Sequence, residues 1–265
     1  MSLKNSLHSW AALRAPVVKP RTQRYHQELI TGILRRWPER CDTPVTEISE
    51  PDVLVLVERI ISLSPSRFNG MVTMLKATVP EARRLKQRRL VLKDRPLISQ
   101  PEFDRLLTEL DRRPRSHAGL VVRFLIHTGL RIHEARQLRW RDVLEDCIVA
   151  PGTLTKNGRA RAIPFVNGMS ELLKSLRSVT GQGERILPQA GCRRSLRTAC
   201  KLAGVPRLSH HDFRHLFATR CIQSGVDVPT AARWLGHRDG GALLGRTYFH
   251  LVDEHSRAMA ARVRI

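Results

Sequence analysis

Apolar residues recur at intervals of three and four positions along much of the chain, which is the spacing of one face of a helix. Leu29, Ile30 and Ile33 show this spacing near the N-terminus. The same pattern predicts a succession of helices over residues 24–35, 50–63, 66–76, 102–112, 116–128, 132–138, 169–178, 193–203, 210–224 and 229–235. The fold is therefore predicted to be mainly helical.

Residues suited to helix ends support several of these assignments. A serine hydroxyl can accept a hydrogen bond from the first turn of a helix, and Ser99 and Ser116 stand where two predicted helices begin. Glycine readily adopts the left-handed conformation that ends many helices, and Gly129, Gly225 and Gly236 follow three of them. These residues fix where the predicted helices stop and start.

One region in the middle of the chain has strand character instead. The segments 147–150, 153–155 and 160–165 are short and rich in residues that favour strands. Asn157 and Gly158 lie between the last two segments, and Asn-Gly is the dipeptide best suited to a tight turn with positive φ. The predicted fold class is therefore mainly α with a small antiparallel β-hairpin sheet.

A strongly basic segment separates two parts of the chain. Seven of the fourteen residues from 82 to 95 are lysine or arginine, and Pro96, where a helix would end, follows them. We expect a helical N-terminal domain over 1–95 and a larger domain over 96–265. The segment is either a solvated linker or a strap that contacts phosphates. The cations considered for such a strap are Arg83, Arg84, Lys86, Arg88 and Arg89.

The overall charge indicates a polyanionic partner. The 265 residues include 46 lysines and arginines against 24 acidic residues, which gives a formal net charge of +22. A protein this basic attracts nucleic acid, although ribosomal or chromatin-type binding would explain the charge as well as an enzyme does. Charge alone therefore predicts the class of partner and not the activity.

Cysteine and hydropathy patterns exclude several other classes. The five cysteines are odd in number and no two have C-x-x-C spacing, so neither a disulfide framework nor a zinc finger is indicated. No apolar run approaches the length that spans a membrane, and the N-terminus carries no signal-peptide core. We expect a soluble cytoplasmic protein with no metal, no cofactor and no membrane attachment.

Polar residues of reactive type gather in roughly the last quarter of the chain. His211 and Arg214 lie three apart and so share a helix face. His237 follows a predicted helix end, and Tyr248 is one of only two tyrosines. Taken alone, each has an ordinary explanation: a solvated helix face, a helix cap or a packed ring.

Two earlier segments contribute further candidates. Arg131 begins a helix directly after a glycine stop, and Glu134 lies one turn further on. Lys156 stands beside the predicted Asn157-Gly158 turn, where a side chain can reach a ligand. Arg131 could equally serve only to pair with Glu134, and Lys156 could be an ordinary exposed turn residue.

Taken together and in this order, the strings TGLRIHEA, LTKNGRARAIPF, LSHHDFRHLFATRCIQSGV, WLGH and RTYFH resemble the catalytic motifs of tyrosine site-specific recombinases, the phage-type integrases. The resemblance covers roughly residues 96–255, and five separated motifs at near-standard spacing make it specific. It implies a catalytic domain over 96–265 that clamps DNA and ends in a tail helix, preceded by a core-binding domain over 1–95. The interval from His237 to Tyr248 is slightly longer than the commonest pattern.

The resemblance also implies a role for each candidate. Tyr248 would be the nucleophile that joins the 3′ phosphate, Lys156 would protonate the leaving 5′ oxygen, and His237 would hydrogen-bond a phosphate oxygen. Arg131 and Arg214 fit a clamp on the negatively charged phosphorane, because a guanidinium offers paired donors that stay charged.

Proton transfer and support complete the predicted site. A free phenol has a pKa of about 10, so its attack needs a base, and His211 is the candidate. Glu134 is expected to hold Arg131 in place. A phosphotyrosine conserves the energy of the broken bond, so neither metal nor ATP is expected to take part. Arg159 and Arg161, beside the predicted turn, are added as candidate DNA contacts.

The partners implied by the resemblance are double-stranded DNA and further copies of the chain, in a tetramer coupled by exchange of C-terminal tails. We expect a mobile-element integrase, bacterial or phage-encoded and associated with the nucleoid. Two alternatives remain open: a type IB topoisomerase that relaxes supercoils as a monomer, and a DNA-binding regulator without catalysis. The target sequence is not predicted, because base contacts and DNA deformability determine it.

Overall fold

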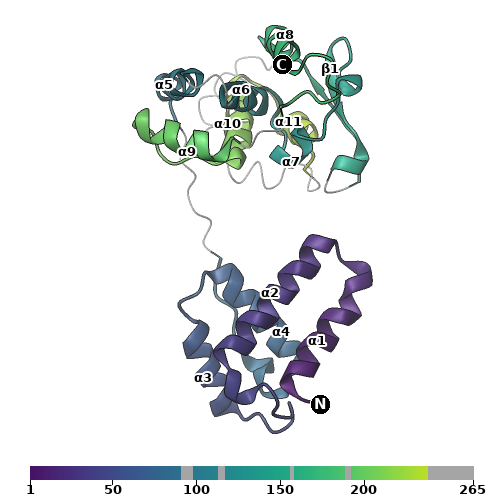
Figure 1. Cartoon of the computed structure of the whole chain (residues 1–265), viewed down its shortest axis with the longest axis vertical. Helices are drawn as coiled ribbons and strands as arrows, with labels where there is room; N and C mark the ends of the chain where they lie inside the picture. The colour runs from purple at the N-terminus through teal and green to yellow at the C-terminus, as the bar shows by residue number, and fades with distance from the viewer. Residues whose placement is uncertain (91–97, 113–116, 156–157, 189–191, 238–265) are drawn as a thin grey trace, which may run out of the picture. The chain divides into compact units, whose positions relative to one another are not determined.

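The structure of the protein is a computed structural model, which describes residues 1–90, 98–112, 117–155, 158–188 and 192–237. The chain divides into two compact units, Met1–Lys93 and Asp94–Ile265, and Figure 1 shows the elements of each. The sequence predicted a domain boundary at residue 95, in the same basic segment.

The N-terminal unit is helical throughout its described elements. Its fully buried side chains include Leu7, Ile33, Trp37, Leu56 and Met71, and these residues belong to one apolar core. α1 packs against α2 and α4. The helices are α1 (Leu3–Arg14), α2 (Pro20–Arg36), α3 (Glu50–Ile60) and α4 (Pro65–Thr78), with 3₁₀ turns at Ala15–Val17, Pro38–Arg40 and Pro80–Arg84.

Helix α1 lies in a stretch for which the sequence predicted no helix. Leu3, Leu7, Trp10 and Ala11 are buried on one of its faces, and Ser2 caps it by accepting a hydrogen bond from the first turn. Charged and small polar residues between these positions weaken the apolar pattern. Packing on α2 and α4, which the sequence does not display, stabilises the helix.

The second unit is also mainly helical, and α6 forms the centre of its core. Helices α5, α8 and α10 pack against α6 (Figure 1), whose Phe124 and Leu125 are fully buried. The helices are α5 (Gln100–Asp111), α6 (Ala118–Thr128), α7 (Ile132–Ala135), α8 (Met169–Thr180), α9 (Arg193–Leu202), α10 (His210–Gln223) and α11 (Val228–Leu235), with 3₁₀ turns at Trp140–Asp142 and Gly152–Leu154.

The described residues form one small sheet, made of β1 (Cys147–Ala150) and β2 (Arg161–Pro164). The strands are antiparallel, with Ile148 opposite Ile163. The predicted fold class, mainly α with a small antiparallel sheet, is confirmed. The predicted tight hairpin between 153–155 and 160–165 is wrong, because the first of these segments forms a 3₁₀ turn instead of a strand.

The connection from β1 to β2 is compact, and its composition explains this correction. Pro151 has no N–H to donate to a strand partner, so the ladder ends before it. Gly152 lies so close to Gly158 that a Cβ at position 152 would stand 2.5 Å from the Gly158 carbonyl oxygen. The Thr155 hydroxyl donates to the carbonyl oxygens of Gly152 and Arg159 at 2.9 and 3.0 Å.

Most of the predicted helix ends are confirmed. Ser99 accepts a hydrogen bond from the backbone N–H of Glu102 and starts α5, while Gly129 and Gly236 adopt left-handed conformations after α6 and α11. Ser116 lies outside the described residues, and α6 begins after His117.

Helix α7 ends at Ala135, which is earlier than the predicted limit of 138. After Ala135 the backbone turns out of the helix, and the Leu138 carbonyl oxygen accepts a hydrogen bond from Ile186 N–H at 3.2 Å. A long-range contact therefore replaces the last predicted turn.

Gly129→Ala is expected to lower the free energy of unfolding by about 2–4 kcal/mol, since a left-handed alanine is strained and the site is already filled. Gly129 has φ +61°, and an added Cβ would collide with the Phe217 ring and stand 2.7 Å from Leu235 Cδ2. Urea unfolding measures the loss. Gly204→Ala is the matched control, because Gly204 also has positive φ but has open space around it. Equal losses in the two variants would contradict the packing argument.

Candidate active site

Arg214, on α10, lies in the interior of the second unit and is 3% exposed. Its Nη1 donates to the carbonyl oxygen of Gly129 at 2.8 Å, and its Nη2 donates to that of Leu235 at 2.7 Å. These carbonyls lie at the C-terminal ends of α6 and α11, where the helix dipole is negative. The two hydrogen bonds therefore orient the guanidinium and join three helices.

The same carbonyls bring two further candidates close to Arg214. Arg131 follows Gly129 by two residues, and His237 follows Leu235 by two residues. Arg131 is partly exposed at the start of α7, and His237 is partly exposed just after α11. Three residues predicted from separate motifs are thus brought to one region of the unit.

Glu134 is fully buried beside Arg131. Its Oε1 accepts from Arg131 Nη1 at 2.9 Å, and its Oε2 accepts from the backbone N–H of Arg131 at 3.2 Å. The Arg131 side chain is 24% exposed and the Glu134 side chain 0%. The carboxylate therefore holds the inner side of a guanidinium that still reaches solvent.

Arg161, which the sequence predicted as a DNA contact, lies in the interior instead. Its Nη2 donates to Glu134 Oε2 at 2.6 Å, and its Nε donates to the Trp234 carbonyl oxygen at 2.9 Å. Alternation along β2 explains the difference, because Arg161 and Ile163 share the buried face of the strand. The Arg161 guanidinium is engaged by the buried Glu134 carboxylate and does not lie among the exposed cations, so the prediction of a surface DNA contact at Arg161 is corrected.

Glu134 is a charged carboxylate at neutral pH. Burial alone would raise its pKa, but the charge of Arg161 and the hydrogen bonds from Arg161 and Arg131 outweigh burial and hold the pKa below its ordinary value. A group whose folded pKa is depressed stabilises the fold above its unfolded pKa, and that contribution is lost as pH falls through the folded pKa.

Glu134→Gln is expected to lower the free energy of unfolding at pH 7 by about 3–5 kcal/mol, since it leaves two guanidinium groups without their anion. The difference from wild type should shrink as pH falls below the ordinary glutamate pKa of about 4.3, because the unfolded wild type takes up a proton there before the folded protein does. Urea unfolding across this range measures both. Glu184→Gln breaks only an exposed pair with Arg139 and should cost less than about 1 kcal/mol. A difference that stays constant with pH would contradict this account.

Two adjacent histidines at the start of α10 lie in different environments. His211 is exposed and its ring packs edge-on against His215 at 4.9 Å. His210 is buried, with Nε2 2.8 Å from the Cys192 sulfur. Burial, and then nearby arginine charges, lower the pKa of His210. Of the two, only His211 is exposed enough to exchange a proton with a substrate.

Lys156 and Tyr248 lie outside the described residues, as does the predicted tail helix. The described residues on either side of positions 156–157 are Thr155, which is buried, and Gly158, which has φ +73°. Both of these residues belong to the compact β1–β2 connection.

Comparison with known families bears directly on this arrangement. Residues 97–255, more than half of the chain, match the Phage integrase family. The chain belongs to the phage integrase family. The matched range includes every catalytic candidate from Arg131 to Tyr248.

Relatives of known sequence agree with this assignment. Tyrosine recombinase XerA of Saccharolobus solfataricus is 30% identical over 155 residues, which cover 56% of this chain and 52% of XerA. Tyrosine recombinase XerC of Staphylococcus saprophyticus is 30% identical over 166 residues, which cover 56% of this chain and 54% of XerC. This integrase-family chain spans about half the length of the curated relatives it matches.

Solved integrases share the fold. A lambda integrase dimer bound to a COC′ core site matches with a TM-score of 0.75 at 19% identity, covering 91% of this chain and 96% of that chain. The Tn1549 transposon integrase in complex with a circular intermediate DNA matches with a TM-score of 0.78 at 16% identity, covering 99% and 100%. At such identities the likeness establishes the fold.

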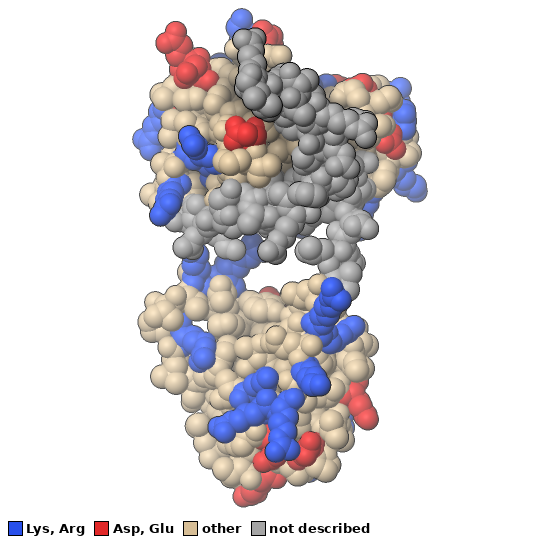
Figure 2. Space-filling model, turned by 180° about the vertical axis from the view of Figure 1, so that it is seen from behind, with Lys and Arg blue, Asp and Glu red and all other residues tan. Residues whose placement is uncertain are grey.

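Most of the predicted DNA contacts of this integrase-family chain lie on its surface. Arg88 is exposed, but its Nη1 donates to the carbonyl oxygens of Ile61 and Leu63 at 2.8 and 2.9 Å. Figure 2 shows lysine and arginine side chains gathered on one face of the N-terminal unit. The other exposed cations among the predicted contacts are Arg83, Arg84, Lys86, Arg89 and Arg159.

Helix α9 carries a basic face that was not among the predicted contacts. Its apolar side is buried through Leu196, Ala199 and Cys200, and the helix packs against α5. The exposed cations are Arg193, Arg194, Arg197 and Lys201. Basic residues four apart on an amphipathic helix were the signal in the sequence.

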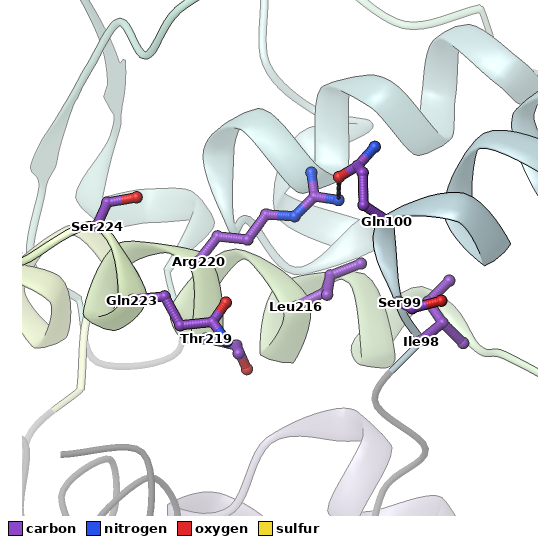
Figure 3. Close-up of a pocket in the computed structure, with 8 residues that line it drawn as sticks. All are labelled: Ile98, Ser99, Gln100, Leu216, Thr219, Arg220, Gln223 and Ser224. Atoms are coloured by element: carbon purple, nitrogen blue, oxygen red, sulfur yellow. Dashed lines mark hydrogen bonds between the residues drawn. The ribbon is translucent and has the colours of Figure 1, made fainter. Parts of the chain in front are cut away.

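An open pocket of about 650 Å³ lies elsewhere in the second unit, between the start of α5 and the length of α10 (Figure 3). Arg220 extends toward Gln100 and donates to its Oε1 at 2.6 Å, and its guanidinium lies 4.8 Å from the Phe103 ring centre. None of the described catalytic candidates lines this pocket, so it is separate from the candidate active site.

The described part of the chain contains neither a candidate metal centre nor a candidate membrane-spanning helix. There, no three histidine, cysteine, aspartate or glutamate side chains gather in a way that could hold a metal ion. No described helix is long and apolar enough to cross a membrane.

Proposed function

We propose that this protein is a site-specific DNA recombinase that cuts a phosphodiester with Tyr248 and rejoins it to a new partner strand. The observation that carries the proposal is the buried guanidinium of Arg214, held by the carbonyls of Gly129 and Leu235. These bonds bring the segments of Arg131 and His237 beside it. Fixed cationic donors of this kind suit a phosphate that gains negative charge during reaction.

Each bond change is assigned to one residue. The Tyr248 phenol oxygen attacks phosphorus, and His211 accepts the phenol proton. The bond from phosphorus to the 5′ oxygen breaks, and Lys156 gives that oxygen a proton. The products are a 3′-phosphotyrosine and a 5′ hydroxyl. Attack by the 5′ hydroxyl of another strand reverses these steps, without ATP, because the phosphotyrosine conserves the bond energy.

The two arginines form the proposed clamp, and their surroundings suit different tasks. Arg214 is buried and oriented by two carbonyls, so its geometry is set before DNA binds. Arg131 is partly exposed and held from behind by Glu134. Both present planar, permanently charged donors to the non-bridging oxygens, and His237 adds a further hydrogen bond.

We extend the proposal to the partners. Lambda integrase has been solved as a dimer on a core site and as a tetramer on a Holliday junction. By analogy, this chain binds double-stranded DNA and recombines it as a tetramer coupled by its C-terminal tails, with the N-terminal unit as a core-binding domain. The exposed cations of the basic segment, Arg159 and the α9 face supply phosphate contacts. A net charge of +22 predicts affinity that falls steeply with salt.

The test has two stages, because the DNA site must first be found. Repeated gel-shift selection from a pool of randomised duplexes enriches sequences that the full chain binds. Enriched duplexes with a nick on either side of their centre are then incubated with the protein, without metal or ATP, and denatured. The fragment released at the nick diffuses away, so a covalent protein–DNA adduct is expected to accumulate. Mass spectrometry of the digested adduct should place the DNA on Tyr248.

The same DNA distinguishes the alternatives. Two enriched duplexes of different length, without nicks, are expected to exchange arms. Binding with no adduct would indicate a DNA-binding regulator without catalysis. An adduct, with relaxation of a supercoiled plasmid but no exchanged arms, would indicate a topoisomerase. Either result would overturn the proposal.

A further inference from the structure

We propose that Arg161 is a positioning residue for the reaction, and that it keeps Arg131 available to the phosphate by taking a share of the Glu134 carboxylate. The inference rests on the proposed function. It gives a role to Arg161, a buried cation for which the sequence predicts a contact with DNA.

Arg161 lies where separate parts of the candidate site meet. From β2, its Nη2 donates to Glu134 at 2.6 Å and its Nε donates to the Trp234 carbonyl oxygen at 2.9 Å. Glu134 belongs to α7, which begins directly after Arg131. Trp234 lies in the last turn of α11, three residues before His237. One side chain therefore ties together the segments that carry two proposed phosphate ligands.

Sharing matters because Glu134 has one negative charge for two guanidinium groups. Its Oε1 faces Arg131 Nη1 at 2.9 Å, and its Oε2 faces Arg161 Nη2 at 2.6 Å. The Arg161 and Glu134 side chains are 6% and 0% exposed, so water screens their attraction weakly. The trio keeps one net positive charge, and Arg131 is the member that reaches solvent.

Loss of Arg161 would change how Arg131 pairs. A carboxylate facing a single arginine tends to form a paired, fork-to-fork contact with it. Glu134 would then draw both edges of the Arg131 guanidinium inward and neutralise its charge. The proposed clamp would lose one of its two arms without any change at Arg131 itself.

The Arg161 side chain also lies close against Gly236. A Cβ at Gly236 would stand 3.0 to 3.2 Å from three atoms of the Arg161 side chain. This glycine, in a left-handed conformation at the end of α11, lets the arginine pass directly beneath the segment that leads to His237. The same β2 strand follows the connection that contains Lys156.

The experiment measures adduct formation at saturating DNA, on the enriched nicked duplex of the preceding test. Arg161→Met keeps an unbranched apolar stem and removes the guanidinium with its charge, and it is expected to slow adduct formation by about 100-fold with little change in DNA affinity. Adding Glu134→Gln removes the unshared carboxylate charge, so the double variant should recover to within about tenfold of wild type. Arg161→Lys keeps the positive charge, so its rate of adduct formation should lie between those of Arg161→Met and wild type.

A second substrate separates positioning from general damage. A scissile methylphosphonate carries a methyl group in place of one non-bridging oxygen and so lacks the negative charge that Arg131 contacts. If Arg161 acts through Arg131, the penalty of Arg161→Met should be much smaller on this substrate. A merely structural defect would slow both substrates equally.

Arg123→Met is the matched control, because it removes another charged pair of the same unit, with Asp111 at 2.8 and 2.6 Å. It should react at the wild-type rate. The inference is overturned if Arg161→Met reacts as fast as wild type, or if it slows both substrates equally and Glu134→Gln restores nothing. If wild type itself forms no adduct, the proposed function fails, which is a distinct result, and the inference falls with it.

Discussion

Tyr248→Phe is expected to abolish the covalent adduct completely while leaving DNA affinity within about twofold of wild type. The substitution removes one oxygen atom and keeps the aromatic ring, so packing and phosphate contacts should change little. That oxygen is the atom proposed to bond phosphorus, and a phenyl ring has no substitute for it. Denaturing gels measure the adduct on the nicked duplex, and gel shifts on the intact duplex measure affinity.

The chain supplies its own control for this substitution. The only other tyrosine is Tyr25, in the N-terminal unit, where its hydroxyl donates to the Ser66 carbonyl oxygen at 3.4 Å. Tyr25→Phe removes the same atom from the same residue type and should form the adduct at the wild-type rate. An adduct that survives Tyr248→Phe would mean that another residue is the nucleophile.

The parts of the fold and site that follow local rules could be predicted from the sequence. Arg131 and Glu134 lie one helical turn apart, so their contact follows from spacing alone. Gly129 and Gly236 have the left-handed conformations that their positions after apolar stretches indicated. The strings around these residues also carried the family resemblance, which the family match confirms.

Long-range packing decided the features that were missed. The sequence predicts a surface cation at Arg161, because this residue stands among other basic residues near a predicted turn. Its burial depends on the alternation of side chains along β2, where Ile163 faces the core, and on partners in α7 and α11. Ile163 was an available signal, since residues two apart on a strand share a face. Helix α1 depends likewise on contacts that no local pattern displays, whereas Pro151 was a local signal for the end of β1.

Stability and the candidate chemistry are coupled in this unit. The hydrogen bond from Arg214 to Gly129 spans 85 positions of the chain, and the Arg161–Glu134 contact spans 27. The same bonds that close the fold also orient the cations of the candidate site. Substitutions at these positions should therefore lower both the stability of the fold and the rate of DNA cleavage. Separating the two effects requires variants that change stability and cleavage rate by different amounts.

Arg214→Ala is expected to destabilise the fold more than Arg214→Lys does. It leaves the carbonyls of Gly129 and Leu235 without their donors, at about 1–3 kcal/mol for each buried acceptor, and it opens a cavity among α6, α10 and α11. We expect a loss of roughly 3–5 kcal/mol in the free energy of unfolding, measured in urea. Adduct formation should fall below detection.

Arg214→Lys separates the two roles of this residue. The ammonium can still satisfy one carbonyl, so the loss of stability should be smaller than in the alanine variant. A lysine cannot present paired planar donors to a phosphate, so adduct formation at saturating DNA should still slow by about 1,000-fold.

Arg220→Lys is the control on the same helix, because Arg220 contacts Gln100 in the separate pocket of Figure 3. It should fold and react like wild type. If Arg214 belongs to a phosphate clamp, Arg214→Lys and Arg220→Lys should differ far more in their rate of adduct formation than in their stability. If both variants cleaved DNA at the wild-type rate, the buried guanidinium of Arg214 would be a structural link between helices, and the phosphate would have to be held by other groups.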